Sequence, residues 1–343
     1  MLDEGTMESA RTGGESAPER RFASLEDYIY GTTALIWEGR GLKLIERFYG
    51  ADAIVRTPLG VTHGVAPVIA ATRATLHEFP DRRLLGEDVI WCAHGDEADA
   101  WTTARPHYSS HRIVSPMTHG GDGAFGMATG RRVRGRTIAD CVVQNERVVE
   151  EWLVRDHGGI LSQLGLDVRE VGKRQAEALR SAGKPVALTP DSDPEGDYRT
   201  PPCSDEAAHR LADALRAAWS GDLAAISASY DEAVALELYG GRSDSGIDAA
   251  TRHWLSLSAA MPDARLSVDH LIGRADPGRP HRVAIRWTAE GSHSGYGTFG
   301  SPTGAPLYLL GITHLELSRG KVHREWTLID ELAIHRQIAA HTG

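Results

Sequence analysis

The sequence predicts an α+β fold made of two tandem copies of one domain. Each half places helix-periodic segments before strand-like segments, and landmarks of the first half return in the second half in the same order. Helices followed by strands indicate an α+β domain, because a parallel sheet would alternate strand and helix along the chain. With 343 residues, the chain is long enough for two domains that each bury a core.

The repeat is clearest at the end of each half. Residues 137–156 align without a gap with residues 311–330, and five of the 20 positions are identical, including a Trp and an Asp four residues later. The spacing between the copies is 174 there, whereas it is 182 at His111 and His293. One difference of eight residues, between His111 and Phe125, explains the change. A repeat of this period indicates that a whole domain was duplicated.

The two halves predict the same elements. Early helices cover residues 25–49 and 205–230, where apolar residues recur at helical spacing, and each half continues with a short strand and a further helix. The short strands are residues 53–58 and 233–238, and the further helices end near Pro80 and Pro262. Strand-like segments then complete a sheet in each half, at 83–93, 97–108, 137–144 and 147–156, and at 265–273, 281–291, 307–318 and 321–330.

Composition places the domain boundaries. Residues 1–22 are polar and predict a disordered tail. Residues 168–203 begin as a charged helical stretch and end rich in Pro and Asp, which is typical of a partly ordered surface linker. The first domain is therefore expected at 23–167 and the second at 204–343.

Charge and composition exclude several functions. A net charge of -10 disfavours nucleic acid and anionic membranes as partners, and no apolar run approaches the roughly 20 residues that cross a bilayer. Three scattered cysteines, with Cys141 in an apolar run that predicts burial, and the absence of an apolar signal at the start favour a cytoplasmic protein. His107 and His111 are four apart in a strand-like segment without the helical geometry of zinc hydrolases, so no metal site is predicted.

The last hairpin of each half ends in an Asp. A strand period of two puts Trp152 and Asp156 on one face, and Trp326 and Asp330 on the matching face of the second half. If that face lines a pocket, burial raises the pKa of the carboxyl group, which suits proton transfer near neutral pH. The alternative is that each Asp caps the helix that follows it.

The expected register of these hairpins distinguishes the two Asp residues. A three-residue turn with Gly320 in the left-handed conformation would place Tyr308 across from Asp330, and Arg134 across from Asp156. A cation opposite Asp156 would keep it ionised, so Asp330 is the favoured acid/base. Trp37, Trp219 and Tyr230 lie on the early helices, where they either pack in the core or form a pocket wall.

Several motifs together resemble a known family. They are Trp37-Glu38-Gly39, Phe79-Pro80-Asp81, Glu151-Trp152 with Asp156, and the "QLG" at 163–165 in the first half, with Trp219-Ser220-Gly221-Asp222, Met261-Pro262-Asp263, "GSHSG" at 291–295, "FGSPTG" at 299–304 and "GKVHREW" through Asp330 in the second half. Both halves resemble SnoaL-like polyketide cyclases of the nuclear-transport-factor-two-like superfamily.

The resemblance implies two cone-shaped α+β-barrel domains. In each, a curved antiparallel sheet wraps around the N-terminal helices and leaves a deep apolar pocket, and the two copies pair through their sheets, with a homodimer also open. It implies that Asp156 and Asp330 are acid/base residues, that His293 lies in a pocket, and that His111 is its first-half counterpart, although His111 lacks the flanking glycines. The substrate wall would be formed by Trp37, Trp152, Trp219, Tyr230, Tyr308 and Trp326.

Two kinds of function remain open at this point. One is a cofactor-free cyclase, dehydratase or isomerase that removes a proton next to a carbonyl of a small hydrophobic substrate, with an epoxide hydrolase-like reaction as a variant. The other is a protein that binds a small hydrophobic molecule without changing it. No cofactor is predicted for either.

Overall fold

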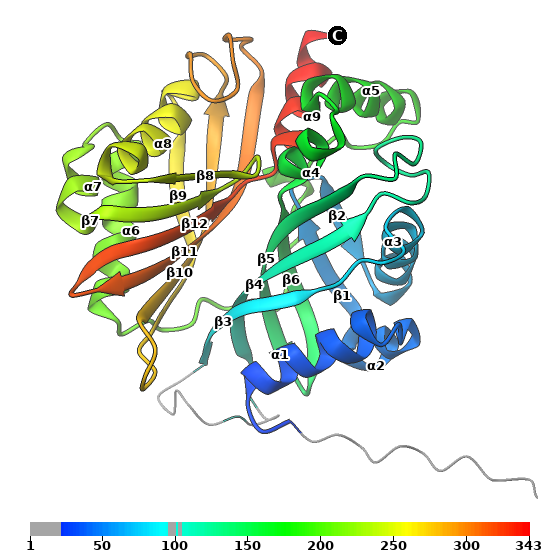
Figure 1. Cartoon of the computed structure of the whole chain (residues 1–343), viewed down its shortest axis with the longest axis horizontal. Helices are drawn as coiled ribbons and strands as arrows, with labels where there is room; N and C mark the ends of the chain where they lie inside the picture. Colours follow the sequence, from blue (N-terminus) through cyan, green and yellow to red (C-terminus); the bar gives the residue numbers. More distant parts are fainter. Residues whose placement is uncertain (1–21, 95–100, 102–104) are drawn as a thin grey trace, which may run out of the picture.

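A computed structural model describes residues 22–94, 101 and 105–343, and these residues form two halves with one six-stranded sheet each (Figure 1). Of the predicted tail, residues 1–21 lie outside the described residues. Phe22 is described and packs in the first core at 5% exposure.

The first half runs from α1 to α4. Its helical segments are α1 (Leu25–Thr33), the π-helical turn η1 (Ala34–Glu38), the 3-10 turn η2 (Leu42–Leu44), α2 (Ile45–Phe48), α3 (Val65–Glu78) and α4 (His157–Leu164). Its strands are β1 (Tyr49–Thr57), β2 (Gly60–His63), β3 (Leu85–Ala93), β4 (His107–Thr118), β5 (Arg132–Gln144) and β6 (Arg147–Arg155).

The second half repeats these elements after a connecting segment with α5 (Val168–Ser181) and the 3-10 turn η3 (Pro190–Ser192). Its helices are α6 (Glu206–Trp219), α7 (Ala224–Ser229), α8 (Ile247–Ala260) and α9 (Glu331–Thr342). Its strands are β7 (Tyr230–Leu238), β8 (Arg242–Ser245), β9 (Arg265–Arg274), β10 (His281–Ser292), β11 (Pro306–Ser318) and β12 (Lys321–Leu328).

Both sheets have the same topology, which confirms the predicted α+β class and the duplication. The strand orders are β2-β1-β6-β5-β4-β3 and β8-β7-β12-β11-β10-β9. The long strands pair antiparallel as expected. Each sheet also contains one parallel pair, which is β1 with β6 in the first half and β7 with β12 in the second. Each sheet is therefore mixed, because the chain crosses over through α3 or α8 and the later strands before it returns beside its own first strand.

The last hairpins differ from the expected register. Their turns have two residues, Asn145-Glu146 and Arg319-Gly320, all with φ between 51° and 78°. This is the type I′ turn that matches the twist of the strands. A bulge then shifts the register in both hairpins. The predicted pairing of Tyr308 with Asp330 and of Arg134 with Asp156 is thus wrong, and the Asp156 amide donates to the Arg136 carbonyl at 3.0 Å.

The length difference between the halves lies upstream of its predicted place. Strands β4 and β10 have 12 residues each and keep the spacing of 174, so the extra residues lie in the connection before His107. The strand expected at 97–108 instead begins at His107. Residues 95–100 and 102–104 of that segment lie outside the described residues.

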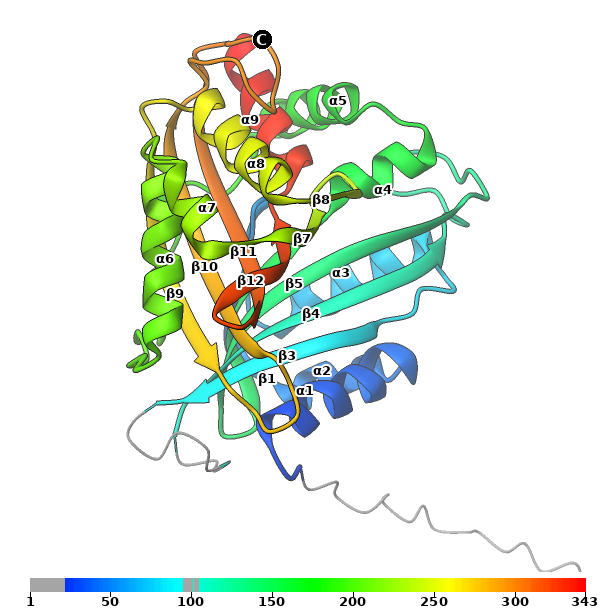
Figure 2. The same ribbon diagram turned by 60° about the vertical axis from the view of Figure 1, so that its left-hand side comes forward.

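The sheets of the two halves lie beside each other (Figure 2), and buried polar side chains make contacts between them. Asp140 of β5 accepts from His270 at 2.8 Å and from Arg286 at 3.0 Å. Ser110 lies 2.8 Å from the ring of His314. The pKa of Asp140 is held far below its usual range because these cations outweigh the opposing effect of burial, and the paired charges fix how the two sheets meet.

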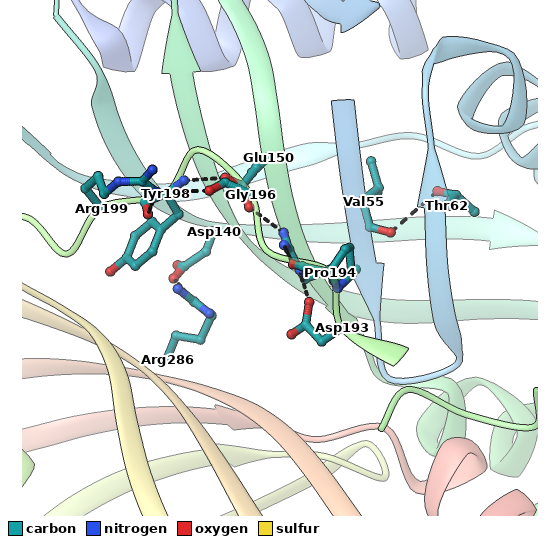
Figure 3. A network of polar contacts seen from close by, with 11 residues as sticks. Val55, Thr62, Asp140, Glu150, Asp193, Pro194, Gly196, Tyr198, Arg199 and Arg286 are labelled. Carbon is teal, nitrogen blue, oxygen red and sulfur yellow. Dashed lines mark hydrogen bonds and ion pairs between the residues drawn. The ribbon is translucent and has the colours of Figure 1, made fainter. Parts of the chain in front are cut away.

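The connecting segment is anchored at both ends. Helix α5, which carries half of the charged residues of the expected linker, buries Val171 and packs against α9 of the second half. Further along, Arg56 donates to Glu150 at 2.6 Å and to the Pro194 carbonyl at 2.7 Å, and it pairs with Asp193 (Figure 3). The Tyr198 amide also donates to Glu150. The segment is therefore part of the packed structure.

Candidate active site

A conical cavity lies inside the first half, between α3 and the sheet. Its deep part has a volume of about 250 Å³ and is walled mainly by apolar residues of the early helices and strands. Its outer part, of about 470 Å³, is lined by β5, α4 and α5, and by α9 of the second half. Thr75, Arg82, Thr137 and Arg155 line both parts, so the two parts adjoin each other at these four side chains.

The strand face that lines this cavity is opposite to the predicted one. Glu151, Leu153 and Arg155 of β6 face the deep part. Trp152, in contrast, packs toward the second half, where the Arg286 guanidinium lies 3.7 Å from its ring centre. The prediction followed the strand period correctly but chose the face that meets the other half, because both faces of this sheet are buried.

The interior of the second half is filled. Trp254 and Trp287 are fully buried there and lie 5.9 Å apart between ring centres. At the same places in the first half are the smaller Thr72 of α3 and Ile113 of β4, both of which line the cavity. Gly311 makes room for Trp287, since a Cβ added there would collide with the indole ring. The first half therefore keeps a cavity where the second half has a packed core.

Tyr49, Glu151 and His111 are among the polar side chains that line the deep part of the cavity. Tyr49 donates from its hydroxyl to Oε2 of Glu151 at 3.0 Å, and burial raises the pKa of Glu151. His111 lines the same space, and burial lowers its pKa to about 4, which leaves the imidazole neutral near pH 7. The residue at the matching place in β10 is Ile285, so this histidine belongs to the first half alone.

Asp156 caps α4 and joins the two halves. Its carboxylate accepts from the Gly159 amide at 2.9 Å, and from the Gly240 and Gly241 amides of the β7–β8 turn at 2.7 and 2.8 Å. Gly159 must lack a side chain, because a Cβ there would lie 2.6 Å from the Gly241 nitrogen. Asp156 therefore caps helix α4, and its hydrogen bonds to Gly240 and Gly241 also link the first half to the second.

Asp330 also caps a helix, but it has a second contact. Its Oδ1 accepts from the Leu332 amide at 3.1 Å, and its Oδ2 lies 2.6 Å from Nδ1 of His157. A carboxylate only accepts, so Nδ1 of His157 carries the proton and Nε2 is left for a ligand. His157 lines the outer cavity beside Phe125 and Arg155. The pair places an oriented imidazole of the first half against a carboxylate of the second.

The counterpart of His293 is His119, and the predicted match with His111 is wrong. Nδ1 of His293 lies 3.0 Å from the Thr303 hydroxyl, and Nδ1 of His119 lies 3.2 Å from that of Thr129. In each half a glycine amide donates to the histidine carbonyl. Around His119, Gly121 matches Gly295, whereas Met117 stands where the second half has Gly291.

The other predicted wall residues fall into three places. Trp37 lines the deep cavity. Trp219 and Tyr230 are buried in the second core. Trp152 and Trp326 stack against arginines of the opposite half, and Tyr308 lines a groove between the halves beside the connecting segment.

Sequence reasoning missed His157, Arg155 and Arg82. His157 directly follows the Asp of the motif, and both arginines lie where the second copy has an apolar residue, Ile329 or Ala264. A comparison of the two halves for polar residues present in one copy only would have singled out the two arginines, but not His157, whose counterpart is Glu331.

The comparisons with known proteins identify the class. Residues 28–164 and 209–338 each match the sequence model of the family described as SnoaL-like polyketide cyclase. The chain therefore belongs to this family and contains its domain twice. A search of curated proteins gives no significant match.

Solved structures with a similar fold match one half of the chain. A protein from Jannaschia sp. CCS1, assigned as a SnoaL-like polyketide cyclase, is 18% identical with a TM-score of 0.36, over 42% of this chain and 99% of its own. IdmH from Streptomyces antibioticus, assigned as a polyketide cyclase, is 22% identical with a TM-score of 0.33, over 41% and 98%. AclR from Streptomyces galilaeus, assigned as a hydroxylase, is 24% identical with a TM-score of 0.33, over 39% and 82%.

The described residues contain no group of three or more His, Cys, Asp or Glu side chains placed to hold a metal ion. Within the same residues, none of the helices has the length and apolar character needed to span a membrane.

Proposed function

We propose that the chain is a cofactor-free acid–base enzyme that acts on a small carbonyl compound in the cavity of the first half. The observation that carries this proposal is the His157–Asp330 contact of 2.6 Å at the cavity wall. A carboxylate that fixes the tautomer and orientation of an imidazole is the arrangement that makes histidine an effective general base. Asp330 is then a positioning residue, and His157 is the group that touches the substrate.

The proposed step is removal of a proton from the carbon next to the carbonyl. The proton goes to Nε2 of His157, and the electron pair moves to the carbonyl oxygen to give an enolate. The guanidinium of Arg155, two residues before His157 on the same cavity wall, stabilises that negative charge. The enolate then attacks a second carbonyl, expels a β-substituent or is protonated elsewhere, which gives cyclase, dehydratase or isomerase chemistry.

Exchange of α-protons tests this proposal without knowledge of the natural substrate. The protein is incubated with phenylacetone or phenylpyruvate in D2O, and loss of the α-proton signal is followed by NMR. We expect faster exchange with the wild-type protein than with His157→Asn, in which the amide still donates to Asp330 but no base remains. Equal rates in the two proteins would exclude His157 as the base. Binding of the ketones without faster exchange would favour a binding protein.

A further inference from the structure

Three arginines that line the first-half cavity have no side-chain hydrogen-bond partner among the residues that the structure describes. Arg82 and Arg336 are 8% and 6% exposed, and Arg155 is half-buried. All three line the outer part of the cavity, and Arg82 and Arg155 also line the deep part. The Nε–H of Arg336 is a buried donor with no acceptor. Buried guanidinium groups are costly unless they are paired, so an unpaired group is a candidate for ligand binding.

The nearby carboxylates are engaged elsewhere. Glu78 accepts from the Phe125 amide at 2.9 Å, and Glu151 accepts from Tyr49. Asp330 accepts from Leu332 and His157. Arg82 therefore faces other cations more than anions, and burial together with Arg155 and Arg40 lowers the pKa of its guanidinium to about 9.

The second half lacks this set of cations. Ala264 and Ile329 stand where the first half has Arg82 and Arg155, and its interior is filled by Trp254 and Trp287. Arg336 lies on α9 of the second half but lines the first-half cavity, and its counterpart on α4 is Ser162. All three arginines are thus present only where they face the cavity. A role in folding common to both copies does not explain them.

We infer that this cavity binds an organic carboxylate whose charged group is held by Arg82, Arg155 and Arg336. The planar guanidinium fork matches a carboxylate in bidentate geometry. The nearby carboxylates Glu78, Glu151 and Asp330 accept hydrogen bonds from other donors, so the guanidinium N–H groups remain available to a bound carboxylate. The apolar walls of the deep part accept the body of the ligand. Calling this ligand the substrate rests on the proposed function, under which it would be a keto acid.

Calorimetry with probe ligands tests the inference independently of turnover. The probes are benzoate, phenylacetate and 4-phenylbutyrate, with phenylacetamide as the uncharged match and phenyl phosphate as the other anion. We expect at least one carboxylate to bind and phenylacetamide to bind at least about tenfold more weakly. Failure of all three carboxylates, or binding of phenyl phosphate alone, would overturn the inference.

Variants then locate the bound charge. Arg82→Gln and Arg336→Gln should each weaken carboxylate binding by about tenfold or more, whereas Arg73→Gln, on the exposed face of α3, should not change it. Because the first two variants remove unpaired buried cations, we expect them to melt at the same or a higher temperature than the wild type. Unchanged affinity in both would refute the assignment. If carboxylates fail to bind but α-proton exchange on phenylacetone depends on His157, this inference falls and the proposed function stands.

Discussion

Nδ1 of His157 lies 2.6 Å from Oδ2 of Asp330, so a side chain of the first half is oriented by a carboxylate of the second. The site is therefore not contained within one copy of the domain. Helix α9 of the second half also contributes Leu332 and Arg336 to the lining of the first-half cavity.

The two Asp residues of the repeated motif should respond differently to the same change. Asparagine caps helices about as well as aspartate, so Asp330→Asn should keep α9 in place while it removes the charge behind His157. We expect α-proton exchange to fall by about 100-fold or more, with an unchanged melting temperature.

Asp156→Asn is the matched control for that variant. The amide group would turn an N–H toward the Gly240 or Gly241 amide, which leaves a buried donor unsatisfied and costs about 1–3 kcal/mol. Exchange per folded molecule should stay near the wild-type rate. Similar losses of activity in both variants would contradict the division of roles.

Closing the first-half cavity should abolish binding. Thr72→Trp places in α3 the residue that α8 carries as Trp254, and Thr72 lines the deep part of the cavity. We expect loss of carboxylate binding in a protein with a native near-ultraviolet circular dichroism spectrum. Ligand affinity at the wild-type level would show that the deep part is not used.

Emptying the second-half core should cost stability. Trp254→Ala removes a fully buried ring and should lower the free energy of unfolding by about 3–5 kcal/mol. Leu255→Ala on the same helix removes a side chain that is 44% exposed and should cost less than about 1 kcal/mol. Urea denaturation of both variants measures the difference, and equal costs would argue against a packed second core.

His111 should make the protein sensitive to acid. Its pKa of about 4 lies below the value of an unfolded histidine, so between pH 6.5 and 4 the unfolded chain binds a proton that the folded chain does not. The free energy of unfolding therefore rises with pH across this window. At pH 5 the low pKa of His111 lowers it by about 2 kcal/mol relative to neutral pH. In His111→Ile, the loss of stability between pH 7 and pH 5 should be smaller by this amount. An identical loss in both proteins would contradict the burial of this ring.

The sequence was sufficient for the architecture and insufficient for the site. The order of helices and strands and the spacing of 174 depend on local patterns, so the duplicated α+β fold followed from them. The face of β6 that lines the cavity did not, because Trp152 and Leu153 lie on opposite faces of a sheet covered on both sides. The side chains of Ala139 and Asp140 show the same ambiguity.

The contacts between the halves were also beyond the sequence. Nothing near His157 indicates that Asp330, 173 residues later, lies beside it. The bulges in the last hairpins are equally hidden, since one extra residue in β6 or β12 changes the partner of every residue after it.

The filled second core has a consequence for symmetry. In a homodimer of identical chains, every substitution appears in both subunits, so Trp254 and Trp287 would close both cavities at once. A covalent tandem removes that constraint, because each copy can mutate without its twin. A symmetric pair of identical single domains could not have this asymmetry, in which the first half keeps a cavity and the second half has a packed core that supports it.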